Sequence, residues 1–147
     1  SRYGWTASRI YLHSLNVDFQ PMWSIDLKLQ HPHANLGVED PRLFTLGSKL
    51  YVAVTGYSKN NEHRTSMILF ALDDEYKQHH STLLEYEARQ TWEKNWVFFE
   101  DNNQLYCVYS VKPHTILRII NEKSIINDSL LREEAHSIWK LKLMENN

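Results

Sequence analysis

The stretch GVEDPRLFTLGSKLYVAVTGY, residues 37–57, decides the fold. After the charged entry EDPR at 39–42, two segments rich in apolar residues flank Gly47-Ser48. Aromatic and β-branched segments around such a pair are typical of a β-hairpin. The entry itself is unusual, because a strand needs no charged residues to begin. Proline is tolerated at the first position of a strand since it has no N–H to donate, so the remaining question is what the acids and the arginine do there.

The rest of the chain also predicts mostly strands. Residues 22–29 alternate between apolar and polar side chains, and short runs rich in aromatic and β-branched residues recur as SMILFAL, NWVFFE, QLYCVYSV and TILRII. Asp101-Asn102-Asn103 lies between two such runs and predicts a second hairpin turn. The C-terminal segment differs, because Leu131, Ala135 and Ile138 fall at helical spacing after an Asn-Asp pair. We therefore expect a C-terminal helix over residues 128–145.

Composition limits the class of protein. At 147 residues, with 42% hydrophobic and 23% charged residues, the chain has the size and make-up of one globular domain. A net charge of −2 argues against nucleic acid or an anionic membrane as partner. A single cysteine, Cys107, excludes an internal disulfide and fits a reducing, cytoplasmic location. The chain begins at Ser1 rather than Met, so we expect a processed or excised piece.

Two stretches of the chain share one pattern. EDPRLFTLGSKLYVAVTGY from Glu39 and EKNWVFFEDNNQLYCVYSV from Glu93 each have a phenylalanine five residues later, Phe44 and Phe98. Each then turns and resumes with Leu-Tyr-x-Val or its near equivalent. The offset is 54 residues before the turn and 55 after it, which predicts a one-residue difference inside a loop. A repeated strand–turn–strand unit of this length is typical of propeller blades, and a chance likeness of two hairpins is the alternative.

The repeat predicts an all-β fold of propeller-type blades, with residues 1–147 as one domain of two to three blades. The inner strands of a propeller converge on its axis, so Asp40 and Lys94, at matching positions, should face one pocket. A propeller has about four to eight blades, so we expect part of a longer propeller. Its open sheet edge would be exposed, covered by the C-terminal helix, or paired by self-association or by the missing remainder.

The motifs GVEDPRLF and LYVAVTGY, followed by EKNWVFFEDNNQLYCVYSVKPH, resemble the mannoside phosphorylases and β-mannosidases of glycoside hydrolase family 130. The resemblance covers roughly residues 10–120. It implies a five-bladed propeller, here partial or divergent, with Glu-Asp-Pro-Arg at the central pocket. It also implies that Asp40 is the general acid and that Arg64, Lys94 and His114 bind phosphate.

The residue types suit that chemistry. Glycosidic cleavage needs an acid to protonate the leaving oxygen, and phosphate needs cations to hold it. We expect the sugar to contact four further side chains, the last two by stacking: Glu39, Arg42, Tyr57 and Trp96. The predicted reaction is inverting phosphorolysis or hydrolysis of a β-mannoside-like bond in an oligosaccharide or glycan. Phosphorolysis is favoured because no second carboxylate is well placed as a base.

Several alternatives stay open. The chain could be a glycosyltransferase relative, or a non-catalytic glycan-binding or structural propeller fragment. The acids and base at 39–42 could form a strand-end ion pair, and His114 could be a packed turn histidine. His31 and His33 alone do not make a metal site. We expect no metal and no cofactor, with inorganic phosphate as a co-substrate.

Overall fold

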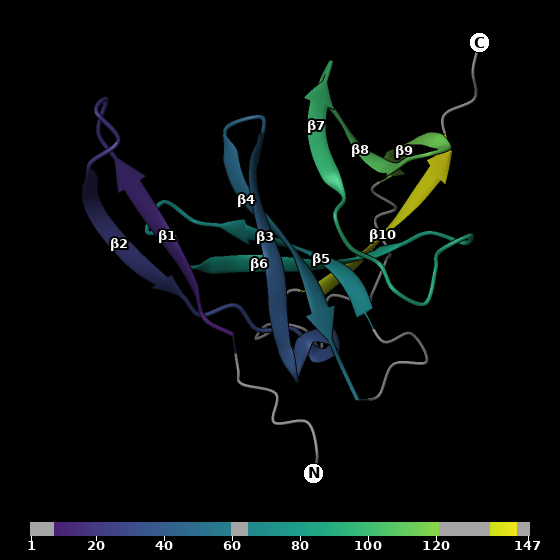
Figure 1. Cartoon of the computed structure of the whole chain (residues 1–147), viewed down its shortest axis with the longest axis horizontal. Coiled ribbons are helices and arrows are strands. Elements are labelled where there is room, and N and C mark those ends of the chain that lie inside the picture. The colour runs from purple at the N-terminus through teal and green to yellow at the C-terminus, as the bar shows by residue number, and fades with distance from the viewer. Residues whose placement is uncertain (1–7, 60–64, 121–135, 144–147) are drawn as a thin grey trace, which may run out of the picture.

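The computed structural model describes residues 8–59, 65–120 and 136–143, and the described part is almost entirely β-structure, as predicted (Figure 1). A short 3-10 helix, η1, spans Pro32–Ala34. The strands are β1 (Ile10–Leu15), β2 (Pro21–Leu27), β3 (Gly37–Leu46), β4 (Lys49–Tyr57), β5 (Thr65–Leu72), β6 (Gln78–Glu85), β7 (Val97–Asp101), β8 (Gln104–Val111), β9 (His114–Ile120) and β10 (His136–Leu143).

The strands form a small sheet and a large one. β1 and β2 pair as a hairpin. β3 to β6 form one antiparallel meander, and β7, β8, β9 and β10 form a second. β10 also pairs in parallel with β6, which joins the two meanders into one sheet of order β3-β4-β5-β6-β10-β9-β8-β7. This described sheet ends at β3 and β7, so it is open.

The first meander is the middle layer of the molecule, as Figure 1 shows. Successive side chains of a strand point to opposite faces, and β4 and β5 bury both faces. On one face, Val52 and Val54 pack with Ile10 and Leu27 of the hairpin. On the other face, the core between the two meanders contains Ala53, Met67, Leu69, Leu84, Trp96, Phe98, Leu105, Cys107, Leu117 and Ile119.

The two hairpins β3–β4 and β7–β8 are equivalent at an offset of 55 residues throughout. Each turns on two residues, between Leu46 and Lys49 in the first hairpin and between Asp101 and Gln104 in the second. The predicted one-residue loop difference is therefore wrong. The sequence comparison matched Phe44 with the wrong member of a Phe-Phe pair.

Stacked cross-strand rings show the correct match. Phe44 and Tyr51 stack with ring centroids 5.5 Å apart and an interplanar angle of 16°. Phe99 and Tyr106 stack at 5.4 Å and 18°. Phe99, not Phe98, is thus the counterpart of Phe44, since 99 − 44 and 106 − 51 both equal 55.

Phe98 instead faces the first meander. Neighbouring residues on a strand point to opposite faces, so Phe98 points toward Phe44, and their rings stack at 5.1 Å and 16°. Nearby, the Gly47 N–H donates to the Glu100 carboxylate at 2.8 Å. Because Phe44 precedes Gly47 and Phe98 precedes Glu100, β3 and β7 run side by side in the same direction.

The C-terminal helix predicted over 128–145 is wrong for residues 136–143, which form β10. The sequence IWKLKL carries the reason, because Trp139, Leu141 and Leu143 alternate with lysines as in a strand. Pairing with β6 and β9, both distant in sequence, determines the outcome. Residues 128–135 lie outside the described part.

Candidate functional site

The charged entry EDPR forms a β-bulge. Glu39 pairs with Thr55 and Arg42 with Ala53, so Asp40 and Pro41 together stand opposite a single residue. Pro41 has no N–H to lose from the ladder. Asp40 has a φ of 52°, in the left-handed region where Asp and Asn are enriched among non-glycine residues. The bulge leaves Glu39, Asp40 and Arg42 all exposed.

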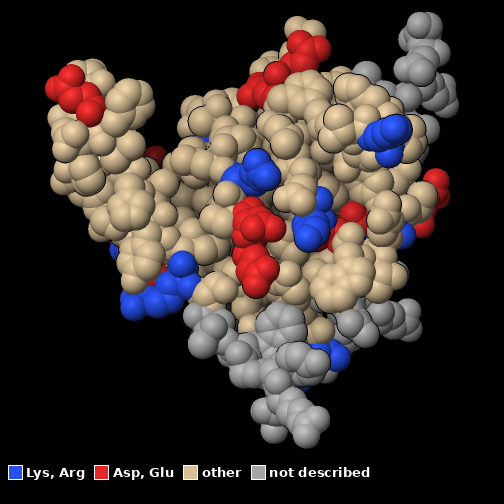
Figure 2. All heavy atoms as spheres, viewed as in Figure 1, with Lys and Arg blue, Asp and Glu red and all other residues tan. Residues whose placement is uncertain are grey.

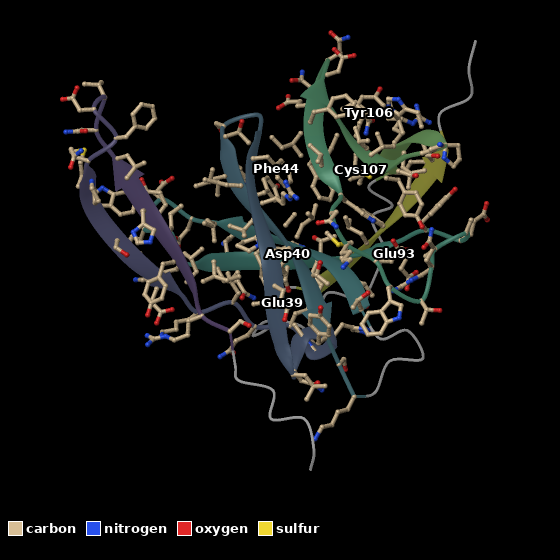
Figure 3. All side chains as sticks on the ribbon, viewed as in Figure 1. Glu39, Asp40, Phe44, Glu93, Tyr106 and Cys107 are labelled. Carbon is tan, nitrogen blue, oxygen red and sulfur yellow. The ribbon has the colours of Figure 1, made fainter. Side chains whose placement is uncertain are left out.

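A tyrosine on the neighbouring strand holds one of the acids. The Tyr57 hydroxyl donates to Glu39 Oε2 at 2.9 Å. Burial raises the pKa of Tyr57 to about 12, helped by this hydrogen bond and by the negative charges of Glu39 and Asp40. The phenol is therefore a neutral donor at physiological pH. Figure 3 shows Glu39 and Asp40 next to each other on β3.

A cleft of about 320 Å³ lies between the bulge and β1. One side is lined by β1 and the two residues before it, and the other side by β3: Ser8, Arg9, Ile10 and Tyr11 on one side and Val38, Glu39, Asp40 and Pro41 on the other. Tyr11 is 45% exposed, and the Arg9 guanidinium carbon lies 5.3 Å from the centre of its ring. The cleft thus combines two carboxylates, an aromatic ring and a guanidinium, groups that suit a polyhydroxylated ligand.

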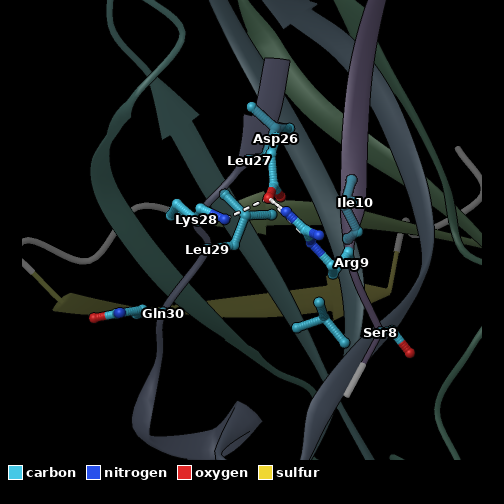
Figure 4. Close-up of a pocket in the computed structure, with 9 residues that line it drawn as sticks. Ser8, Arg9, Ile10, Asp26, Leu27, Lys28, Leu29 and Gln30 are labelled. Carbon is cyan, nitrogen blue, oxygen red and sulfur yellow. Dashed lines mark hydrogen bonds and ion pairs between the residues drawn. The ribbon is translucent and has the colours of Figure 1, made fainter. Parts of the chain in front are cut away.

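A smaller cavity of about 190 Å³ adjoins it, between the start of β1 and the end of β2 (Figure 4). There the Asp26 carboxylate binds both Lys28 and Arg9. Hydrogen bonds from Lys28 and Arg9 hold the pKa of Asp26 below its usual value. This ion-paired group orients Arg9 at the edge of the larger cleft.

The predicted phosphate-binding set is not assembled in this cleft. Lys94 is exposed in the loop that leads into β7, at the end where β3 begins. His114 is exposed at the start of β9. Neither residue is among those lining the cleft, and Arg64 lies outside the described residues. Figure 2 shows acidic side chains over β3 with basic side chains beside them.

The repeat places these residues differently from expectation. At the offset of 55, Lys94 corresponds to Glu39, and the counterpart of Asp40 is Asn95. Asn95 also has a left-handed backbone, with a φ of 64°. The expected equivalence of Asp40 and Lys94 is therefore wrong by one residue, although an acid and a base still stand at matching places.

Trp96 cannot stack on a sugar, which corrects the sequence prediction. Its side chain is only 2% exposed and lies between the meanders, tilted edge-on to Tyr109 with centroids 5.2 Å apart. Tyr11 is the aromatic residue that lines the cleft, and it was not predicted from the amino-acid sequence. The signal for Tyr11 was its place on the outward face of an alternating strand, between the inward-facing Ile10 and Leu12.

Glu93 is a second residue whose role the sequence did not reveal. It is 4% exposed, and its carboxylate accepts hydrogen bonds from the Gln90 N–H, from the Trp96 indole at 3.1 Å and from the Tyr109 hydroxyl at 3.0 Å. Its own N–H donates to Thr65. Burial and the charge of Glu93 raise the pKa of Tyr109 to about 12. Glu93 thus fixes the loop that leads into β7.

No protein family, no curated protein and no solved structure matches the chain. The resemblance to family 130 therefore rests on the motif residues alone and stays a prediction.

The remaining sequence candidates have structural roles. His31 Nδ1 accepts from the His33 N–H at 3.1 Å and so caps η1. Within the described ranges, no three His, Cys, Asp or Glu side chains converge as metal ligands. Cys107 is buried in the core between the meanders, and burial raises its pKa to about 12. No described helix is long and apolar enough to span a membrane.

Proposed function

We propose that the cleft beside the bulge binds a glycan and that Asp40 acts there as the general acid that cleaves a β-mannoside-like bond. The observation that carries this proposal is the placement of Asp40. It is an exposed carboxylate on a left-handed bulge at the edge of a 320 Å³ cleft, beside Glu39 bonded to Tyr57. Bulges next to clefts commonly direct a functional side chain.

Inorganic phosphate is the proposed attacking group. Hydrolysis with inversion needs a second carboxylate roughly 6.5–9.5 Å from the acid. Of the acids considered from the sequence, Glu39 adjoins Asp40 and binds Tyr57, and Glu93 is buried with its oxygens occupied. Phosphate is already anionic and needs only cations to hold it, and we propose Lys94 and His114 for this role although neither lines the cleft. Lys94 lies in the loop that leads into β7, and β7 runs beside β3.

The test is cleavage of β-mannosides with and without phosphate. We expect phosphate-dependent turnover, which Asp40→Asn abolishes while glycan binding persists and which Lys94→Ala weakens. Asp101→Asn, an exposed carboxylate at the β7–β8 turn, is the matched control and should retain activity. If turnover is as fast without phosphate, both in wild type and in Lys94→Ala, the reaction is hydrolysis and not phosphorolysis.

A non-catalytic glycan-binding site is the second candidate. It is favoured by the absence of Lys94 and His114 from the described cleft lining, and by Tyr11, whose exposed ring suits sugar stacking. Binding of mannosides without turnover, lost in Tyr11→Ala, would support this candidate. Neither binding nor turnover on any mannoside would contradict both.

We also propose that the two meanders are propeller blades. Each has four antiparallel strands, the meanders pack face to face, and their first strands lie side by side. The parallel pairing of β6 with β10 departs from an ordinary propeller, in which outer strands separate. An experimental structure in which β3 and β7 do not border a common axis would contradict the proposal.

A further inference from the structure

Among the residues that the structure describes, the second meander exposes a surface whose counterpart in the first meander is covered. In the first meander, the stacked pair Phe44–Tyr51 is partly buried against the core between the meanders, where Phe98 covers it. Its counterpart, the pair Phe99–Tyr106, lies on the outer face of the second meander, and Phe99 is 38% exposed. Val97, on the same face and opposite Val108, is also exposed. We call Val97, Phe99, Tyr106 and Val108 the Phe99 face.

The residue that should cover this face can be read from the same repeat. Phe98 pairs with Cys107, and at the offset of 55 the corresponding pair in the first meander is Leu43 with Val52. Leu43 is thus the counterpart of the side chain that covers Phe44. It is 53% exposed, although Val52 beside it is buried against the β1–β2 hairpin. We call Leu43 and Thr45, the exposed side chains on this face of β3, the Leu43 face; Leu50, opposite Thr45, is partly buried against the core under the β1–β2 hairpin.

We propose that a second copy of this chain docks head to tail, with its Leu43 face on the Phe99 face of the first copy. A contact already present inside the chain identifies the partner. There, Phe98 of the second hairpin packs on the Phe44–Tyr51 pair of the first, and Leu43 is the residue equivalent to Phe98. Docking would repeat that contact between chains. This inference does not depend on a catalytic role for Asp40.

The contact is heterologous, because it joins two different surfaces. Each copy keeps one free Leu43 face and one free Phe99 face, so assembly continues until a ring closes or a filament grows. Apolar surfaces centred on an aromatic side chain commonly carry most of the affinity of an interface. Removing either Phe99 or Leu43 should therefore disrupt assembly.

Sedimentation velocity over a concentration series tests the proposal with the full chain. Wild type should associate, and Phe99→Asp and Leu43→Asp should each raise the dissociation constant by about tenfold or more. Val111→Asp replaces another exposed apolar residue, at the β8–β9 turn, and should leave association unchanged. A 1:1 mixture of Phe99→Asp and Leu43→Asp should form dimers and nothing larger, because one intact face of each kind remains.

The mixture also separates this contact from others. Dimers that form in the mixture but in neither variant alone show that both variants fold. A symmetric Phe99–Phe99 contact could not give this result, because Leu43→Asp alone would then still dimerise. A disulfide that forms between Phe99→Cys and Leu43→Cys chains, but not within either variant alone, would be a second positive result. A monomeric wild type, or a mixture that stays monomeric while wild type associates, would overturn the proposal.

Discussion

Asp40 and Asn95 share a left-handed backbone, with φ angles of 52° and 64°, at matching positions of the two repeats. Left-handed geometry is routine only for glycine and, less often, for Asp and Asn. The two residues therefore keep one backbone feature while their surroundings differ. Asp40 stands at the edge of a cleft, whereas Asn95 precedes the buried Trp96.

Alanine at either position should destabilise the fold by a similar amount. We expect Asn95→Ala and Asp40→Ala each to lower the free energy of unfolding by about 1–2 kcal/mol, because alanine lacks the short polar side chain whose local hydrogen bonds let Asp and Asn adopt the left-handed conformation. Asn95→Gly and Asp40→Asn should stay close to wild type. Urea denaturation measures this, and unchanged stability in both alanine variants would argue against the left-handed geometry.

Gly56 is required by a close approach of η1 to β4. A Cβ atom there would lie 2.5 Å from Ile68 Cδ1 and 2.9 Å from the His33 carbonyl oxygen. Since one of these contacts is backbone, Gly56→Ala should cost about 1–3 kcal/mol. Gly47 provides the contrast, because nothing lies within 4 Å of a Cβ there and its φ of 57° suits asparagine. Gly47→Asn should therefore be tolerated in thermal unfolding, and Gly56→Asn should not.

The two Glu–Tyr hydrogen bonds should differ in their contribution to stability. The Tyr109–Glu93 bond involves a buried carboxylate, and the Tyr57–Glu39 bond an exposed one, at similar lengths of 3.0 and 2.9 Å. A hydrogen bond to a charged group contributes about 1.5–3 kcal/mol. We expect Tyr109→Phe to lose an amount in that range and Tyr57→Phe to lose less, because water can replace its contact. Double-mutant cycles with Glu93→Gln and Glu39→Gln would measure each coupling.

The all-β class and both hairpin turns could be predicted from sequence, because aromatic and β-branched runs and turn residues act locally. The register of the repeat could not. Phe98 and Phe99 offer two alignments that differ by one residue, and only the pairing of Phe99 with Tyr106 distinguishes them. The helix expected near the C-terminus fails for a similar reason, since β6 and β9 supply the partners of β10.

The candidate site was partly predictable for the same physical reasons. Glu39, Asp40 and Arg42 are exposed at one bulge because Pro41 and a left-handed aspartate are local signals. The alternation of β1 indicates that Tyr11 is exposed, but only the packing of β1 against the first meander brings Tyr11 to the bulge. The loop into β7 shows most clearly what the sequence does not predict. Trp96 and Lys94 were both expected at the site, but Trp96 is buried and Lys94 is exposed.

Alkaline pH should weaken the fold through two partly buried tyrosines. Tyr57 and Tyr109 have pKa values near 12 in the fold, against 10 for an ordinary tyrosine. Between pH 10 and 12 the unfolded chain binds fewer protons than the folded chain, so stability falls as pH rises. The Tyr57→Phe/Tyr109→Phe variant should lose less stability than wild type over this window. The free energy of unfolding is measured by urea denaturation at each pH. Equal slopes of this free energy against pH in the two proteins would contradict the assignment.

The parallel pairing of β6 and β10 sets a requirement on the order of folding. Its register joins His136 to Ser81, so the chain must close a loop of 55 residues, whereas β3, β4 and β5 pair with immediate neighbours. Distant pairings form late because loop closure costs entropy before any contact repays it. We expect amides of β4 and β5 to gain protection before those of β10 in pulse-labelling hydrogen exchange. Simultaneous protection would instead indicate that the whole sheet forms in one step.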